Sequence, residues 1–161
     1  MTHNANTYNK IIVAVENDEL DEKLCSRATR ISELFGSKIK LVHVTEPLSP
    51  LMIPSLGALG PVSVESDEYT KAMGEHTRAI KSVKAGLLYL ANNMISPAVT
   101  TKVIEATDVR AAFQIEAEAF SCDLIIVGSW GRSGLAPRFG GATASNILKN
   151  SPCDILAISM N

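Results

Sequence analysis

Five of the ten glycines of this 161-residue chain fall within residues 128–141. They follow an apolar run that ends at Val127 and precede a segment expected to be helical. Glycines let the backbone approach phosphate oxygens closely, and the free N–H groups at the start of a helix bind anions. Arg132 and Arg138 can add charge-assisted hydrogen bonds. The spacing therefore indicates a phosphate-binding loop; the alternative is a segment that merely turns the chain.

The segment differs from two well-known phosphate-binding loops. No Lys follows its glycines in a G-x-x-x-x-G-K-[ST] arrangement, and the first expected strand is not followed by G-x-G-x-x-G. Hydrolysis of a bound phosphate needs a placed base or metal ligands. The acids expected near the pocket rim, Glu16, Asp18 and Glu46, form no evident catalytic pair. We therefore predict no catalytic residue, and at most slow hydrolysis.

The elements that must position this loop alternate between strand and helix. Short apolar, mostly β-branched runs predict strands at 10–15, 39–44, 101–104, 123–127 and 154–158. Helical periodicity predicts helices over 20–35, over 66–90 and from 108 to 120. Because parallel strands need crossover connections, the alternation predicts an α/β fold, a parallel sheet with helices on both faces. Ligands of such sheets bind at the carboxyl ends of the strands.

Several details of the helices follow from the same patterns. Asn17 and Asp18 are predicted to cap the first helix and Gly36 to end it, while Asp108 caps the last. Glu116 falls on the apolar stripe of that last helix. We expect its long side chain to reach out of the core to water. The long helix is predicted to turn these residues inward: Tyr69, Met73, Ile80, Val83, Leu87 and Leu90.

Composition excludes several classes of protein. The net charge of −2 and the lack of a Lys/Arg cluster argue against nucleic acid or an anionic membrane as partner. No stretch approaches the roughly 20 apolar residues of a membrane helix, and the polar residues 1–7 do not resemble a signal peptide. Cys25, Cys122 and Cys153 are predicted to be buried, reduced thiols. We expect a cytoplasmic, metal-free domain over 8–161 after a flexible N-terminus at 1–7.

The glycine segment resembles the G-x-x-G, nine residues, G-[ST] signature of the nucleotide-binding universal stress proteins. Gly128–Gly131 supplies the first half, residues 132–140 are the nine, and Gly141 is the last glycine. The closing run 150–156 is also similar to that family, and the resemblance covers roughly residues 8 to 159. It implies a single open five-stranded parallel sheet in the order 3-2-1-4-5, the adenine nucleotide alpha-hydrolase-like fold.

The resemblance also implies where a nucleotide would bind. The adenine is expected at the backbone of Val44, the ribose at the acid that ends the first strand, here Glu16, and the phosphates at the glycine loop. The expected ligand is ATP, or ADP or AMP, with or without Mg²⁺. The expected binding residues are Ala14, Val15, Glu16, Val44, Gly128, Trp130, Gly131, Arg132, Gly134, Gly141, Ala142 and Thr143.

The chain departs from the family pattern at three of these positions. Glu16 replaces the usual Asp, with one more methylene; its other interpretation is an acid placed beside a helix start. Ala142 replaces Ser or Thr, and the lost hydroxyl is expected to weaken binding about tenfold. Thr143 is adjacent, but one step along a helix turns a side chain by about 100°. Trp130 is either a flap on the nucleotide or an exposed loop aromatic.

Three hypotheses for function remain at this stage. The first is an ATP- or ADP-binding regulatory stress-response protein whose bound state changes its surface for a partner. The others are a nucleotide-independent stress protein that acts through its surfaces, and a slow ATPase. The resemblance implies a homodimer, expected through strand 154–159, because an unpaired edge invites pairing between subunits. The proline-rich stretch 47–64 is predicted to be a loop that covers a ligand, a second subunit or its own sheet edge.

Overall fold

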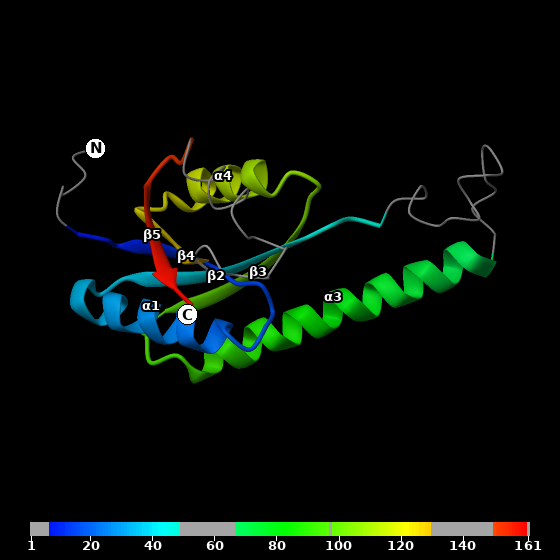
Figure 1. Ribbon diagram of the computed structural model, residues 1–161, viewed down its shortest axis with the longest axis horizontal. Coiled ribbons are helices and arrows are strands. Elements are labelled where there is room, and N and C mark those ends of the chain that lie inside the picture. The colour runs from blue at the N-terminus through cyan, green and yellow to red at the C-terminus, as the bar shows by residue number, and fades with distance from the viewer. Residues whose placement is uncertain (1–6, 49–66, 97, 130–149, 161) are drawn as a thin grey trace.

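The computed structural model describes residues 7–48, 67–96, 98–129 and 150–160. These form a five-stranded parallel sheet in the order β3-β2-β1-β4-β5, as predicted (Figure 1). The strands are β1 (Lys10–Ala14), β2 (Lys38–Thr45), β3 (Val99–Glu105), β4 (Leu124–Ser129) and β5 (Asp154–Ser159). β1 is the central strand. β2 and β3 lie on one side of it, and β4 and β5 lie on the other.

Helices cover both faces of the sheet. Helices α1 (Asp21–Phe35) and α3 (Asp67–Asn93) lie on one face, and α4 (Val109–Phe120) lies on the other (Figure 1). Alternate residues of β1 point to opposite faces: Ile11 and Val13 pack with α1 and α3, while Ile12 packs with α4. The central strands therefore contribute to two apolar cores, as expected for a parallel sheet buried on both sides.

The predicted helix ends are partly confirmed. Gly36 ends α1 with a left-handed φ of 68°, and the Asp108 carboxylate accepts a hydrogen bond from the Ala111 N–H at the start of α4. The prediction for the start of α1 was wrong. The helix begins at Asp21 after Leu20, with no side-chain cap. Asp18 instead accepts a hydrogen bond from the Leu20 N–H, which turns the chain just before the helix.

The inward face predicted for α3 is confirmed only in the C-terminal half of the helix. Leu87 and Leu90 are buried and Val83 packs against them, but Met73 is 39% exposed. The reason is length, because 27 residues of helix span about 40 Å whereas the seven residues of β3 span about 23 Å. The first half of α3 therefore projects beyond the sheet (Figure 1).

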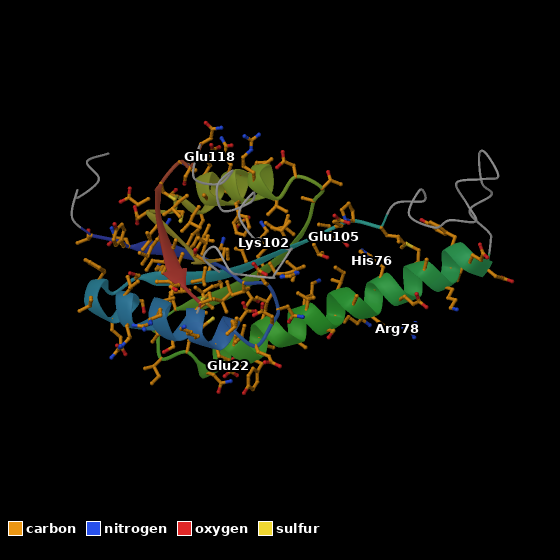
Figure 2. All side chains as sticks on the ribbon, in the orientation of Figure 1. Glu22, His76, Arg78, Lys102, Glu105 and Glu118 are labelled. Carbon is orange, nitrogen blue, oxygen red and sulfur yellow. The ribbon has the colours of Figure 1, made fainter. Side chains whose placement is uncertain are left out.

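One polar contact joins the projecting half of α3 to the sheet. His76 Nε2 lies within hydrogen-bonding distance of the Glu105 carboxylate at the end of β3. The two side chains face each other across the gap between helix and strand (Figure 2). This contact links α3 to β3 at a level where no apolar side chain of the helix is buried among the described residues.

Glu116 is not solvated, contrary to the expectation for its place on the apolar stripe. It is 3% exposed on α4, and its carboxylate oxygens bind Lys40 Nζ at 2.7 Å and Lys102 Nζ. The two lysines come from β2 and β3, so the acid pairs with cations that the sheet supplies beneath the helix. The Lys40 ammonium also lies 4.2 Å from the centre of the Phe120 ring.

Candidate functional site

The carboxyl ends of β1, β2 and β4 converge at one edge of the sheet. Ala14 is paired with Val42, so continuing that register by two residues brings Glu16 level with Val44. In the same way, Val13 is paired with Ile126, so Gly128 is level with Val15. Because β1 lies between the other two strands, the residue that follows it is flanked by both. This edge is where open α/β sheets bind their ligands.

A small hollow opens at this edge, between the end of β1, the start of α1 and the end of β4. It is lined by Ala14, Glu16, Asp18, Asp21, Gly128 and Met160, among others. The structure therefore brings Ala14, Glu16 and Gly128 together from two strands. Val15 and Val44 adjoin them, and their side chains are turned into the two cores.

The chain after β1 is held by the buried carboxylate of Asp21. One of its oxygens accepts the Glu16 N–H at 3.0 Å and the other accepts the Asp18 N–H at 3.0 Å. Between them Asn17 adopts a left-handed φ of 64°, a conformation that Asn tolerates. Burial raises the pKa of the Asp21 carboxyl, against the backbone N–H bonds, which lower it. Asp21 thus fixes the turn that carries Glu16.

His43 joins the ends of β2 and β1 beside this turn. Its Nδ1 lies 2.9 Å from the Val15 carbonyl oxygen. A carbonyl only accepts hydrogen bonds, so Nδ1 carries the proton. The Val15 N–H in turn donates to the Val42 carbonyl at 3.0 Å. The N–H and the carbonyl of Val15 therefore both have hydrogen-bond partners on β2, which anchor the chain to β2 just before Glu16.

The C-terminal end of the described chain reaches the same hollow. The Met160 N–H donates to the Ser129 carbonyl, and the Met160 side chain lies against Gly128. A Cβ at Gly128 would lie 3.2 Å from Met160 Cγ, closer than ordinary contact. Glycine at this position therefore leaves room for the Met160 side chain, which lines the hollow.

The twelve predicted binding residues fall into two groups. Ala14, Val15, Glu16, Val44 and Gly128 lie toward the carboxyl edge of the sheet, and their role in binding a ligand stays a prediction. Seven lie outside the described residues: Trp130, Gly131, Arg132, Gly134, Gly141, Ala142 and Thr143. The same is true of residues 49–66, which include most of the proline-rich stretch, and of residues 1–6, in the predicted flexible N-terminus.

Sequence reasoning missed Asp21 and Met160 as parts of this site. Asp21 is one of four acids within residues 16–21, and nothing in the sequence marks it as the buried one. Met160 follows β5, and it meets Gly128 only because β5 pairs with β4. The sequence alone does not reveal that pairing. One sequence feature could have pointed to Asp21. It comes three residues after Asp18, a spacing at which a carboxylate can accept hydrogen bonds from the N–H groups of the preceding turn.

No group of three or more His, Cys, Asp or Glu side chains in the described part of the chain is arranged to hold a metal ion. None of the helices described there is long and apolar enough to cross a membrane.

The strand order and the helices on both faces define the fold class of this protein, an open parallel α/β domain of the adenine nucleotide alpha-hydrolase-like fold. The model of the universal stress protein family matches residues 7–159, and the chain belongs to that family. It is 27% identical over 152 residues to universal stress protein A homolog 2 of Coxiella burnetii, a match that covers 94% of each chain.

Solved structures share the fold. A universal stress protein solved in complex with cAMP is similar with a TM-score of 0.59 at 17% identity, over 97% of this chain and 100% of that one. The universal stress protein of Archaeoglobus fulgidus in complex with dAMP is similar with a TM-score of 0.60 at 16% identity, over 94% and 98%. At these identities the likeness concerns the fold alone.

Proposed function

We propose that this protein is a regulatory stress-response protein that binds ATP or ADP at the carboxyl edge of its sheet. The observation that carries the proposal is the convergence of Glu16 and Gly128 in one hollow at that edge, beside the end of β2 that carries Val44. A carboxylate is the natural acceptor for ribose hydroxyls, and a glycine-lined strand end admits a ligand closely. The glycines that follow β4 in the sequence supply the phosphate-binding part of the same site.

Each part of the nucleotide has an assigned contact in this proposal. Glu16 accepts hydrogen bonds from the ribose, and the backbone of Val44 meets the adenine. The phosphates, with or without Mg²⁺, lie against the segment that begins at Gly128 and includes Gly131 and Arg132. That two relatives of the same fold were solved with cAMP and dAMP supports an adenine nucleotide as the class of ligand. Hydrolysis, if measured, is slow.

A second candidate function follows from the two replacements in the signature. Glu16 shifts the position of the carboxylate, and Ala142 lacks the hydroxyl usual at that position. A member of the family with a weakened site acts through its surfaces alone, as a nucleotide-independent stress protein. The turn around Glu16 favours the first candidate, because a buried carboxylate holds it in a defined conformation.

Assembly and location belong to the same proposal. β5 lies at the edge of the sheet and pairs with β4 on one side only among the described strands. We propose that residues 154–159 form the interface of a homodimer, in which the two edges meet. The domain works in the cytoplasm, where its nucleotide is available, and the loaded dimer presents its surface to a regulatory partner.

Replacing Glu16 by Ala is expected to weaken ATP binding about 10- to 100-fold, because a hydrogen bond to a charged group contributes about 1.5–3 kcal/mol. Isothermal titration calorimetry measures the dissociation constants. Glu19→Ala is the matched control, since Glu19 is an exposed acid of the same turn. It should bind ATP like the wild type.

A ribose analogue separates this contact from general electrostatics. Glu16→Ala should weaken the binding of 2′,3′-dideoxy-ATP less than it weakens the binding of ATP, because the analogue has no ribose hydroxyl for the carboxylate to bind. An equal loss with both nucleotides would mean that Glu16 does not meet the ribose. Unchanged ATP affinity in Glu16→Ala would remove this residue from the site.

A further inference from the structure

Two of the three cysteines lie side by side at the opposite end of the sheet from the nucleotide edge. Cys122 and Cys153 precede β4 and β5, whose first residues Leu124 and Asp154 are paired. Neighbouring strands run about 4.8 Å apart, and a disulfide needs Cα atoms closer than about 7 Å. Both cysteines pack against the same apolar core beneath α4. The fold thus meets the distance requirement for a disulfide without moving either strand.

The two neighbouring thiols shift each other's pKa in opposite directions. The neighbouring Cys122 thiol is the main cause that lowers the pKa of Cys153, and the nearby Ser151 hydroxyl, 3.9 Å from its Sγ, acts in the same direction. The Cys153 thiol, together with burial, raises the pKa of Cys122, whose Sγ also lies 3.1 Å from the Leu124 carbonyl oxygen. The pKa of Cys153 is therefore the lower of the two, which makes Cys153 the better first nucleophile in stepwise thiol–disulfide exchange.

We propose that Cys122 and Cys153 form a reversible intramolecular disulfide when the protein meets a small-molecule disulfide such as oxidised glutathione. The Cys153 thiolate attacks one sulfur of the oxidant, forms a mixed disulfide and releases one thiolate, which takes up the proton that Cys153 lost. The Cys122 thiol then gives up its proton and attacks Cys153 Sγ, which releases the second small thiol. The two protein thiols are oxidised by two electrons, and one disulfide is reduced to two thiols.

Cys25 provides an internal reference for this chemistry. It is 3% exposed on α1, and burial raises its pKa to about 12, so it remains a protonated thiol that small oxidants do not reach. Cys122 and Cys153 are each partly exposed. The prediction that all three cysteines are buried is thus correct for Cys25 and wrong for the other two, which precede β4 and β5 at the rim of the sheet.

The test uses the purified full-length protein in glutathione buffers that range from fully reduced to fully oxidised. Samples are quenched with acid, unfolded and alkylated, and their intact masses and proteolytic peptides are measured. In oxidising buffer we expect a monomer with one alkylated thiol, at Cys25, and a peptide in which Cys122 is joined to Cys153. Dithiothreitol should restore all three alkylated thiols.

Two single variants test the assigned order of steps. Cys122→Ser should accumulate glutathione on Cys153, because no second thiol resolves the mixed disulfide. Cys153→Ser should acquire glutathione on Cys122 at least about tenfold more slowly, because burial, which raises the pKa of Cys122, remains in this variant. Equal rates in the two variants would overturn the order. Three alkylated thiols in the wild type under the most oxidising buffer, or a disulfide that joins two chains, would overturn the proposal itself.

Discussion

Replacing Glu116 by Gln is expected to lower the free energy of unfolding by about 2–3 kcal/mol at neutral pH. The carboxylate is buried on α4 and binds Lys40 and Lys102 with its two oxygens. An amide keeps the size but turns an NH₂ donor toward one ammonium, so one pair is lost and the other is weakened. The cost is below the full 3–5 kcal/mol of an uncompensated buried charge, because the Lys102 side chain is half exposed and reaches water.

The pH dependence of this loss identifies its cause. Burial alone would raise the pKa of Glu116, but the hydrogen bonds and charges of Lys102 and Lys40 outweigh it and hold the pKa below the ordinary 4.5. The stabilisation is therefore complete above pH 4.5 and is lost as the pH falls through the lowered pKa. The difference between wild type and Glu116→Gln should shrink in that acid range.

Thermal unfolding from neutral to acid pH measures both quantities, and a loss of 2–3 kcal/mol corresponds to about 5–10 °C in melting temperature. Glu118→Gln is the matched control, the same change on an exposed position of the same helix. It should leave the melting temperature within about 1–2 °C of the wild type. If Glu116→Gln behaved like Glu118→Gln, the buried ion pairs would contribute nothing.

Replacing Asp21 by Asn is expected to destabilise the protein by about 2 kcal/mol and to weaken ATP binding with it. Both carboxylate oxygens of Asp21 accept backbone N–H groups, from Glu16 and Asp18. Asn accepts with one oxygen only and presents a donor to the other N–H, so the turn that positions Glu16 loosens.

Glu22→Gln is the control for this prediction, because Glu22 is an exposed acid in the same first turn of α1. The variant removes the same negative charge from the helix start without touching the turn. Urea unfolding gives the stabilities and calorimetry the ATP affinities. Equal stability of Asp21→Asn and Glu22→Gln would show that only the charge matters and that Asp21 does not hold the turn.

The sheet could be predicted from the sequence because its strands are continuous apolar runs that helices separate. Such runs as 123–127 have no solvated face, so their pattern does not depend on which strands are neighbours. The strand order came from the family resemblance, since a run of apolar residues carries no information about its partner. The partners of Glu116 needed that order, because Lys40 and Lys102 are brought together only by the pairing of β2 with β3.

The site could be predicted only where a local pattern marked it. Glu16 follows β1 and Gly128 lies near the end of β4, and parallel strands end at the same edge, so their proximity follows from the fold class. Asp21 and Met160 act through contacts across several elements and left no local pattern. The outward course of α3 was missed for a related reason, because periodicity gives the face of a helix but not the length of the sheet beneath it.

The central claim is that the carboxyl edge of this sheet binds an adenine nucleotide, and a thermal-shift titration tests it most directly. Wild-type protein and Gly131→Val are melted with increasing ATP, ADP, AMP and GTP, with and without Mg²⁺. A ligand at about 100 times its dissociation constant stabilises the folded state by about 2.7 kcal/mol. We predict a rise in melting temperature with ATP and ADP that GTP does not reproduce and that Gly131→Val abolishes. No shift at millimolar nucleotide, or the same shift with GTP, would contradict the claim.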